Sequence, residues 1–219
     1  MIAVITYDHP HRKTQDLLFR LMLSGYIDID LIVLPWQDRP ETHPLYRHRP
    51  LEPVDISIEK LCSTFNLNYY RRDYNDLGLL QNYSKILIAG TGILPEDVTK
   101  YKIINSHPGY LPNVRGLDAL KWAILNGQPI GVTTHFIGAE TDTGILIERR
   151  ILPIYHTDTF HSIALRQYET EIDMLVNSLS IEPEGTELKA YREYPVNKRM
   201  GAHDEIRMMS RLNKLIGSQ

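Results

Sequence analysis

Asn105-Ser106-His107 places two side chains that can do chemistry directly after a short apolar run. Residues two apart in an extended chain point to the same side, so Asn105 and His107 can both face one reacting atom. Taken alone, the pattern also fits a polar turn in which Asn105 stabilises the backbone and His107 makes a structural hydrogen bond. Asp142, shortly before Gly144, has the same two interpretations: a functional carboxylate or a turn residue.

The elements that must position these residues alternate between short apolar runs and helical periodicities. Strands are expected at 2–6, 29–34, 85–89, 101–105, 131–137 and 145–152. Helices are expected at 14–23, 56–65, 117–125, 159–179 and 204–215. The alternation predicts an α/β fold, with a Rossmann-like, mostly parallel sheet and helices on both faces. Ligands bind beyond the carboxyl ends of such strands, which predicts that 7–13, 90–95 and 105–112 lie near one another.

Composition excludes several classes of function. The 219 residues are 42% hydrophobic and 23% charged, with a net charge of -3, as in an ordinary globular chain. The 24 basic residues are scattered, which disfavours nucleic acid as a partner. No apolar run approaches the roughly 20 residues that span a bilayer, and no signal-peptide pattern opens the chain, so we expect a cytoplasmic protein without a membrane partner. Cys62 cannot form an internal disulfide, and no Cys/His set has the spacing of a metal site.

A resemblance to the folate-dependent formyltransferases is carried by NSHPGYLP at 105–112, with Gly116 and Ala119. GVTTH at 131–135 and ETDTGILI at 140–147 continue the resemblance in the same order, and it is strongest from 85 to 152. This superfamily includes glycinamide ribonucleotide formyltransferase, methionyl-tRNA formyltransferase, sugar N-formyltransferases and formyltetrahydrofolate deformylase. The resemblance implies that the formyltransferase fold occupies 1–180, as a catalytic domain on which a C-terminal extension at 181–219 packs.

The resemblance also implies a catalytic set formed by Asn105, His107 and Asp142. Asn105 and His107 can stabilise negative charge that grows on the formyl oxygen when an amine attacks. Asp142 can hold the imidazole, favour its charged form and move protons. No covalent enzyme intermediate is required, and Ser106 lies on the alternating side of the strand, which disfavours a serine triad. His135, inside a predicted strand, is expected to be structural.

The formyl donor implied by the resemblance is 10-formyltetrahydrofolate, with no metal. Its expected binding residues come from two segments: Gly90, Thr91, Gly92, Ile93 and Leu94 in the first, and Gly138, Ala139 and Glu140 in the second. Backbone groups of both segments can bind the edges of the pterin while Ile93, Leu94 and Ile103 pack on its faces. The same glycines also fit a plain strand-to-helix turn, and their spacing is not that of a dinucleotide-binding fingerprint.

The amine acceptor follows from elimination. The glycinamide ribonucleotide enzymes have a Gly-Ser-Asn turn after the first strand, where this chain has YDHPHRK at 7–13. We expect neither the basic second domain of the methionyl-tRNA enzymes in the residues after 152 nor the added N-terminal domain of the deformylase before the first strand at Ile2. A sugar N-formyltransferase remains, and its small-molecule acceptor is expected to be a phosphorylated or nucleotide-linked amine, with an amino sugar favoured.

We expect the acceptor to contact the cationic groups at the start of the first helix and an aromatic side chain, namely His11, Arg12, Lys13 and Tyr110. The long polar segment 36–53, together with Tyr191, Arg192, Tyr194, Lys198 and Arg199, can add stacking and diphosphate contacts. Alternatives are a glycinamide ribonucleotide formyltransferase-like enzyme, a formyltetrahydrofolate hydrolase, or a noncatalytic folate-binding sensor. The sequence leaves the oligomeric state open, including a homodimer.

Overall fold

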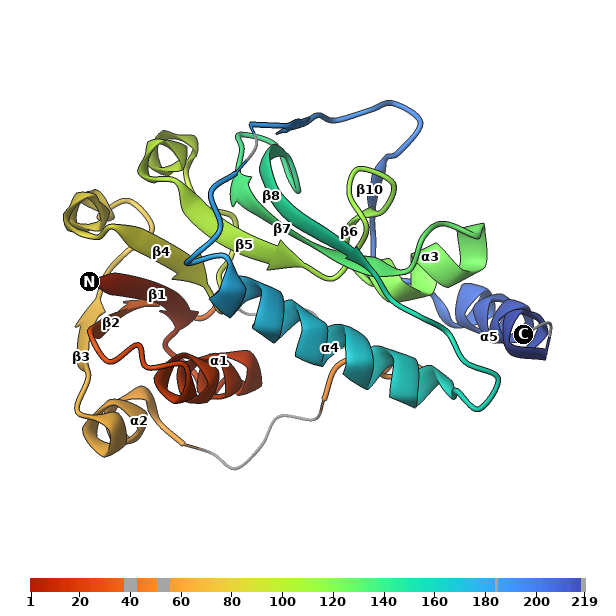
Figure 1. The fold of residues 1–219 in the computed structure, drawn as a ribbon, viewed down its shortest axis with the longest axis horizontal. Coiled ribbons are helices and arrows are strands. Elements are labelled where there is room, and N and C mark those ends of the chain that lie inside the picture. Colours follow the sequence, from red (N-terminus) through yellow and green to blue (C-terminus); the bar gives the residue numbers. More distant parts are fainter. Residues whose placement is uncertain (38–42, 51–55, 184, 218–219) are drawn as a thin grey trace.

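A central sheet organises the computed structural model, which describes residues 1–37, 43–50, 56–183 and 185–217 (Figure 1). Within that part of the chain, eight strands pair in the order β3-β2-β1-β4-β5-β7-β8-β9. They are β1 (Ile2–Tyr7), β2 (Ile29–Leu34), β3 (Asn68–Arg71), β4 (Lys85–Ile88), β5 (Ile103–His107), β7 (Gly131–Ile137), β8 (Gly144–Ile151) and β9 (Glu187–Leu188). The first five strands in this order are parallel, and β7, β8 and β9 are antiparallel to their neighbours.

Helices cover both faces of the sheet, as the sequence predicts. One face packs against α1 (Arg12–Leu23), α2 (Ile58–Phe65) and α4 (Phe160–Asn177). The other face packs against two 3-10 helices, η1 (Gly78–Asn82) and η2 (Glu96–Tyr101). Successive residues of β1 alternate between these layers, with Val4 in the first core and Ile5 in the second. Because both faces are covered there, the inner parallel strands β1, β2 and β4 are largely apolar, whereas the edge strand β3 is mostly exposed.

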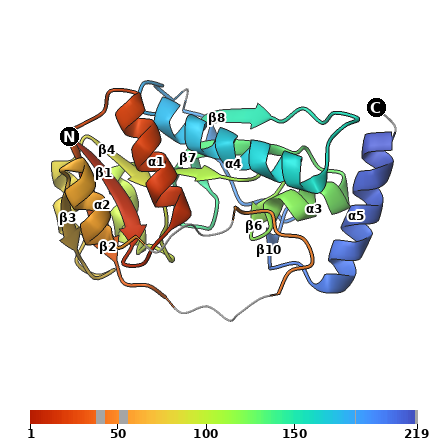
Figure 2. The ribbon, with the colours of Figure 1, turned by 90° about the horizontal axis from the view of Figure 1, so that it is seen from below.

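A further apolar cluster lies where α3 (Ala119–Asn126) and α5 (Ala202–Gly217) pack together (Figure 2). Met208 and Leu212 of α5 are buried there against Leu120 and Ile124 of α3. The C-terminal residues also reach the strands: β9 pairs with β8, and β10 (Val196–Asn197) pairs with the two-residue strand β6 (Arg115–Gly116). None of the helices in the described ranges is long and apolar enough to cross a membrane.

Several predicted boundaries differ from the structure. The strand expected at 101–105 is β5 at 103–107, because η2 occupies the residues before it. The helix expected to start at residue 14 starts at Arg12, and the short strands β3, β6, β9 and β10 were not predicted. Within 36–53, the stretches 36–37 and 43–50 contain neither helix nor strand, as expected. The rest of that segment lies outside the described residues.

Candidate active site

The end of β5 places Asn105 and His107 on one face of the sheet. Ser106 points to the opposite face, where its buried Oγ accepts a hydrogen bond of 3.1 Å from Thr134 Oγ1. Its hydroxyl is thus a structural partner of β7, on the side away from His107. The Asn105 side chain is half-buried, and it makes no side-chain hydrogen bond to the other residues that the structure describes. Its amide is available to a ligand.

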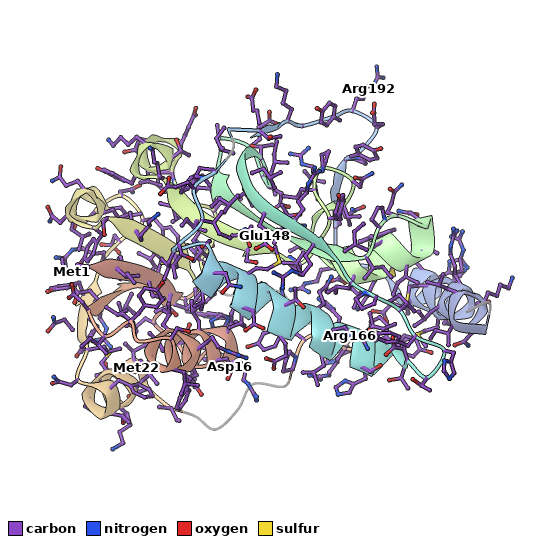
Figure 3. All side chains as sticks on the ribbon, viewed as in Figure 1. Met1, Asp16, Met22, Glu148, Arg166 and Arg192 are labelled. Carbon is purple, nitrogen blue, oxygen red and sulfur yellow. The ribbon has the colours of Figure 1, made fainter. Side chains whose placement is uncertain are left out.

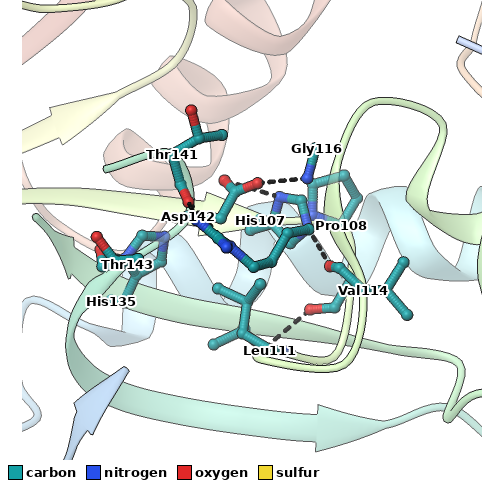
Figure 4. Close-up of polar contacts among 12 residues, drawn as sticks. His107, Pro108, Leu111, Val114, Gly116, His135, Thr141, Asp142 and Thr143 are labelled. Carbon is teal, nitrogen blue, oxygen red and sulfur yellow. Dashed lines mark hydrogen bonds and ion pairs between the residues drawn. The ribbon is translucent and has the colours of Figure 1, made fainter. Parts of the chain in front are cut away.

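His107 forms a buried ion pair with Asp142 (Figure 4). Its Nδ1 lies 3.2 Å from Asp142 Oδ1, and its Nε2 lies 2.9 Å from the carbonyl oxygen of Val114. Both ring nitrogens face acceptors, so only the imidazolium donates to both. Burial lowers the pKa of His107, but the Asp142 carboxylate and the hydrogen bonds outweigh it, and the pKa lies above the ordinary value. The geometry favours a charged imidazole.

Asp142 reaches His107 by an unusual backbone path. Because β7 is antiparallel to β5, the loop 138–143 leaves the sheet beside the start of β5 and must fold back over the strands to reach His107. Asp142 itself has φ +53°, a left-handed conformation that carboxylate and amide residues tolerate better than most. Its Oδ2 accepts a hydrogen bond of 2.6 Å from the Gly116 amide. Burial raises the pKa of Asp142, but His107 and the Gly116 amide hold it at about 2.

His135 lies directly across from Asn105 in the β5–β7 pair. Its Nδ1 is 3.0 Å from the Thr143 carbonyl oxygen, so the ring supports the loop that carries Asp142. Burial lowers the pKa of His135 to about 4, which keeps the ring neutral at pH 7. The expected structural histidine is therefore placed against the catalytic loop, with its Nε2 buried and unpaired among the described residues.

The first segment expected to bind folate follows β4 and packs against the end of β1. Tyr7 donates its hydroxyl proton to the Thr91 carbonyl oxygen, and the Gly92 amide donates to the Tyr74 hydroxyl at 3.0 Å. A side chain at Gly90 would collide with the rings of Tyr7 and His11, so glycine is required there. Ile93 is 89% exposed, an apolar surface that a flat ring can cover. Ile103, also expected to pack on the pterin, is instead buried in the core between the sheet and the 3-10 helices, so it is not available to the ring.

The second expected folate segment, Gly138 to Glu140, belongs to the same loop as Asp142. A reverse turn holds it: the Gly138 amide donates to the Thr143 carbonyl oxygen at 2.8 Å, and Thr143 Oγ1 donates to the Glu140 carbonyl oxygen at 2.8 Å. Ala139 lies between these two anchors. The loop is thus fixed to the strand carrying His135.

The basic residues at the start of α1 are already paired with carboxylates. Arg12 Nε contacts Asp16 Oδ2 at 2.8 Å, and Figure 3 shows Asp16 where α1 meets α4. Lys13 Nζ contacts Glu171 Oε1 of α4 at 2.7 Å. His11 precedes the helix, and its Nδ1 lies 2.9 Å from Thr14 Oγ1. The side-chain charge of this cluster is largely neutralised within the protein.

The aromatic and basic residues proposed for the acceptor are spread over the molecule. The Arg149 guanidinium lies 5.0 Å from the centre of the Tyr110 ring. Arg192 projects from the outer edge of the C-terminal segment (Figure 3), and Arg199 pairs with Asp118 at 3.2 Å. The structure therefore places His11 beside Gly90 and Lys13 beside Glu171, and it does not gather the whole predicted set.

Sequence reasoning did not assign the partners that hold His107 and Asp142 in place. Val114 and Gly116 act through backbone atoms, which no side-chain pattern reveals. Glu171 is 1% exposed and binds both Lys13 and Arg49, and an acidic residue on the inner face of a predicted helix was the one available signal. Arg49 lies in the polar stretch 43–50, where no periodicity identifies it.

Comparisons with known proteins identify a family for the chain. A family profile described as "Formyl transferase" matches residues 62–179, which is more than half of the chain. Methionyl-tRNA formyltransferase of Thermosynechococcus vestitus is 32% identical over 103 residues, covering 45% of this chain and 31% of its own length. The chain thus spans less than a third of that relative.

Solved structures of low sequence identity share the fold. A sugar N-formyltransferase from Shewanella sp. superimposes with a TM-score of 0.60 at 17% identity, covering 96% of this chain and 87% of the other. Phosphoribosylglycinamide formyltransferase from Anaplasma phagocytophilum superimposes with a TM-score of 0.58 at 20% identity, covering 82% of this chain and 84% of the other. With the His107–Asp142 pair at the end of β5 and the family profile spanning it, the chain belongs to the formyl transferase family.

Proposed function

We propose that this protein transfers the formyl group of 10-formyltetrahydrofolate to a primary amine. The observation that carries the proposal is the buried His107–Asp142 pair next to the half-buried amide of Asn105. A positive imidazolium and an amide donor on one face of β5 suit an oxygen on which negative charge develops. Its pKa of about 2 keeps Asp142 ionised at neutral pH, so the carboxylate can hold the imidazolium in place and take part in proton transfer.

In the proposed reaction, the neutral amine attacks the formyl carbon, a new C–N bond forms and the bond to the folate nitrogen breaks. The Asn105 amide and the His107 charge stabilise the formyl oxygen. Asp142, directly or through water, receives the proton that the amine loses and returns one to the leaving nitrogen. Because a cationic amine cannot attack, the rate should rise from acidic to mildly basic pH until the acceptor is neutral.

The formyl donor is proposed to bind between Gly90–Leu94 and Gly138–Glu140. The exposed side chain of Ile93 and the backbone groups of the two loops supply a ring face and ring edges. Calorimetry with 5-formyltetrahydrofolate, a stable stand-in for the donor, is expected to detect binding. Well-folded protein that does not bind this compound even at millimolar concentration would refute the donor assignment.

The acceptor is proposed to be a nucleotide-linked amino sugar. Supporting this choice, the sugar N-formyltransferase superimposes over 96% of the chain, against 82% for the phosphoribosylglycinamide enzyme. A panel of amino-sugar nucleotides, glycinamide ribonucleotide and a reaction without acceptor, all supplied with 10-formyltetrahydrofolate, tests it. Formylated sugar nucleotide is the expected product. Formate released without any amine would instead identify a hydrolase.

The phosphate groups of the acceptor are proposed to bind at the start of α1. This helix has no acidic residue in its first turn, and its N-cap residue His11 makes no side-chain capping hydrogen bond. The helix dipole and the amides there favour an anion, with Arg12 and Lys13 nearby. Replacing Arg12 and Lys13 by Ala is expected to raise the KM for the acceptor several-fold and leave folate binding unchanged. Unchanged acceptor kinetics at low and moderate salt would place the anchor elsewhere.

A further inference from the structure

A three-residue segment, Val114 to Gly116, contacts both members of the catalytic pair. The Val114 carbonyl oxygen accepts from His107 Nε2 at 2.9 Å, and the Gly116 amide donates to Asp142 Oδ2 at 2.6 Å. Between them, the Arg115 guanidinium donates to the Thr141 carbonyl oxygen through Nε at 3.1 Å and Nη2 at 2.6 Å. We call this segment the clamp. Its position fixes the distance between imidazole and carboxylate.

The clamp is too short to hold itself in place. Its strand β6 has two residues, and its partner is β10, in which Val196 pairs with Arg115 and Asn197 with Gly116 (Figure 1). Asn197 adds two hydrogen bonds: its Nδ2 donates to the Arg115 carbonyl oxygen at 3.0 Å, and its own carbonyl oxygen accepts from the Leu117 amide at 2.9 Å. Asn197 therefore binds the residues on either side of Gly116.

The fit between the two strands is close. Gly116 has φ +85°, and a side chain there would collide with the backbone carbonyl oxygen of Asn197. A two-residue ladder with this little clearance transmits a displacement of Asn197 directly to Gly116. The Gly116 amide would then move relative to Asp142.

We propose that Asn197 is a positioning residue for His107 and Asp142, acting through the clamp. The effect of Asn197 on the position of the clamp follows from these contacts, and its effect on turnover rests on the proposed formyl transfer. Asn197 itself contacts Arg115 and Leu117, one step removed from the reacting groups. Its substitution should change turnover and the His107–Asp142 contact, and should leave substrate binding as it is.

The neighbouring residue of the same segment provides a matched control. The Lys198 carbonyl oxygen accepts a hydrogen bond of 2.7 Å from Trp122 Nε1 on α3, and the Met200 amide donates to Asp118 Oδ2 at 3.0 Å. These contacts anchor the segment to α3 and do not involve the clamp. Trp122→Phe removes one hydrogen bond from the segment, as Asn197→Ala does, but at the other anchor.

The experiment compares Asn197→Ala, the bulkier Asn197→Leu and Trp122→Phe with the wild-type protein. Losing one hydrogen bond from a side chain to the backbone should lower kcat about 3- to 10-fold in both Asn197 variants. The KM values for donor and acceptor should be unchanged. The second readout is the pKa of His107 by NMR, which should fall in the Asn197 variants because Asp142 is less well placed. Trp122→Phe should leave both readouts near wild type.

The NMR readout separates this inference from the proposed function. The charged and titratable groups that act on His107 are Asp142 from the loop after β7, His135 from β7 and Glu171 from α4, and the variants change none of them. A lowered His107 pKa supports the positioning role even if no acceptor is ever formylated. The positioning role is overturned if folded Asn197 variants keep the wild-type His107 pKa and kcat, or if Trp122→Phe lowers both by as much as the Asn197 variants do.

Discussion

The His107–Asp142 pair and the Glu171 carboxylate, which binds Lys13 and Arg49, are both buried, but they hold charge in different ways. The first joins an imidazole, whose ordinary pKa is near 6.5, to one carboxylate, so its surroundings decide whether it is charged at pH 7. The second joins one carboxylate to two cations whose ordinary pKa values lie far above 7. Burial raises the pKa of Glu171, but Arg49 and Lys13 hold it at about 2.

The comparison separates a pair whose charge depends on its surroundings from a link built on a carboxylate that stays ionised near neutral pH. Glu171 connects α4 to the start of α1 through Lys13, and to the stretch 43–50 through Arg49. Its charge is permanent near neutral pH, so its expected contribution is to stability. The charge of His107 depends on Asp142, so removing either residue should affect chemistry first. Substitutions at the two sites can test this division.

The largest effect is expected from truncating the catalytic side chains. Asn105→Ala, His107→Ala and Asp142→Ala should each lower turnover by roughly 100-fold or more, because each removes charge stabilisation or proton transfer. The losses should not add in double variants, since the residues act together. Single-turnover kinetics with an accepted amine measures the effect. His203→Ala, at an 87% exposed site, is the control, and near-normal turnover of His107→Ala would refute the mechanism.

The next effect concerns stability at the cluster. Glu171→Gln leaves Lys13 and Arg49 without their anion, and losing one partner of a buried ion pair is costly. Because the Arg49 side chain is 39% exposed, solvent offsets part of this cost. We expect the free energy of unfolding to fall by about 2 kcal/mol. Urea unfolding followed by circular dichroism measures the change. A variant as stable as wild type would show that the two cations find other partners.

The His107 pKa is expected to respond to Asp142→Asn without loss of the fold. Burial, which lowers the pKa, is then no longer outweighed, so the pKa should fall below the ordinary value and the ring should be neutral at pH 7. NMR titration of the imidazole nitrogens measures this. A His107 pKa that stays raised in Asp142→Asn would mean that Glu171 or the Val114 carbonyl sets the charge.

The same pair gives stability a defined pH window. The stability that the raised pKa of His107 contributes is fully present below about pH 6.5, and it is lost as the pH rises through the raised pKa of the folded state. The stability that the lowered pKa of Asp142 contributes is fully present above about pH 3.8, and it is lost as the pH falls towards about 2. The stability difference between wild type and Asp142→Asn should therefore be greatest between these limits, and unfolding at several pH values checks it.

The sequence predicts the parts of the molecule whose signal is local. The apolar runs of β1 and β2 and the helix ending at Gly127 carry their own patterns, and the motif at 105–112 identifies Asn105 and His107. The strands β3, β9 and β10 have two to four residues and little apolar character, so no periodicity can indicate them. The pairing of Lys13 with Glu171 spans 158 positions in the chain. The parallel-sheet rule also fails for Asp142, because its strand β7 is antiparallel.

The smallest effect is expected two residues away from Glu171 on the same helix. Glu169 contacts Arg20 at 3.2 Å, with a side chain that is 52% exposed, and Arg20 keeps a second partner in Asp173 at 3.2 Å. Glu169→Gln should therefore change stability by less than about 0.5 kcal/mol, because water and salt screen an exposed pair. Unfolding in parallel with Glu171→Gln, at low and at high salt, should show a small difference that salt removes for Glu169 and a large one that persists for Glu171. Equal losses at the two positions would mean that burial is not what distinguishes them, and the contrast between a fixed buried link and a solvated surface pair would fail.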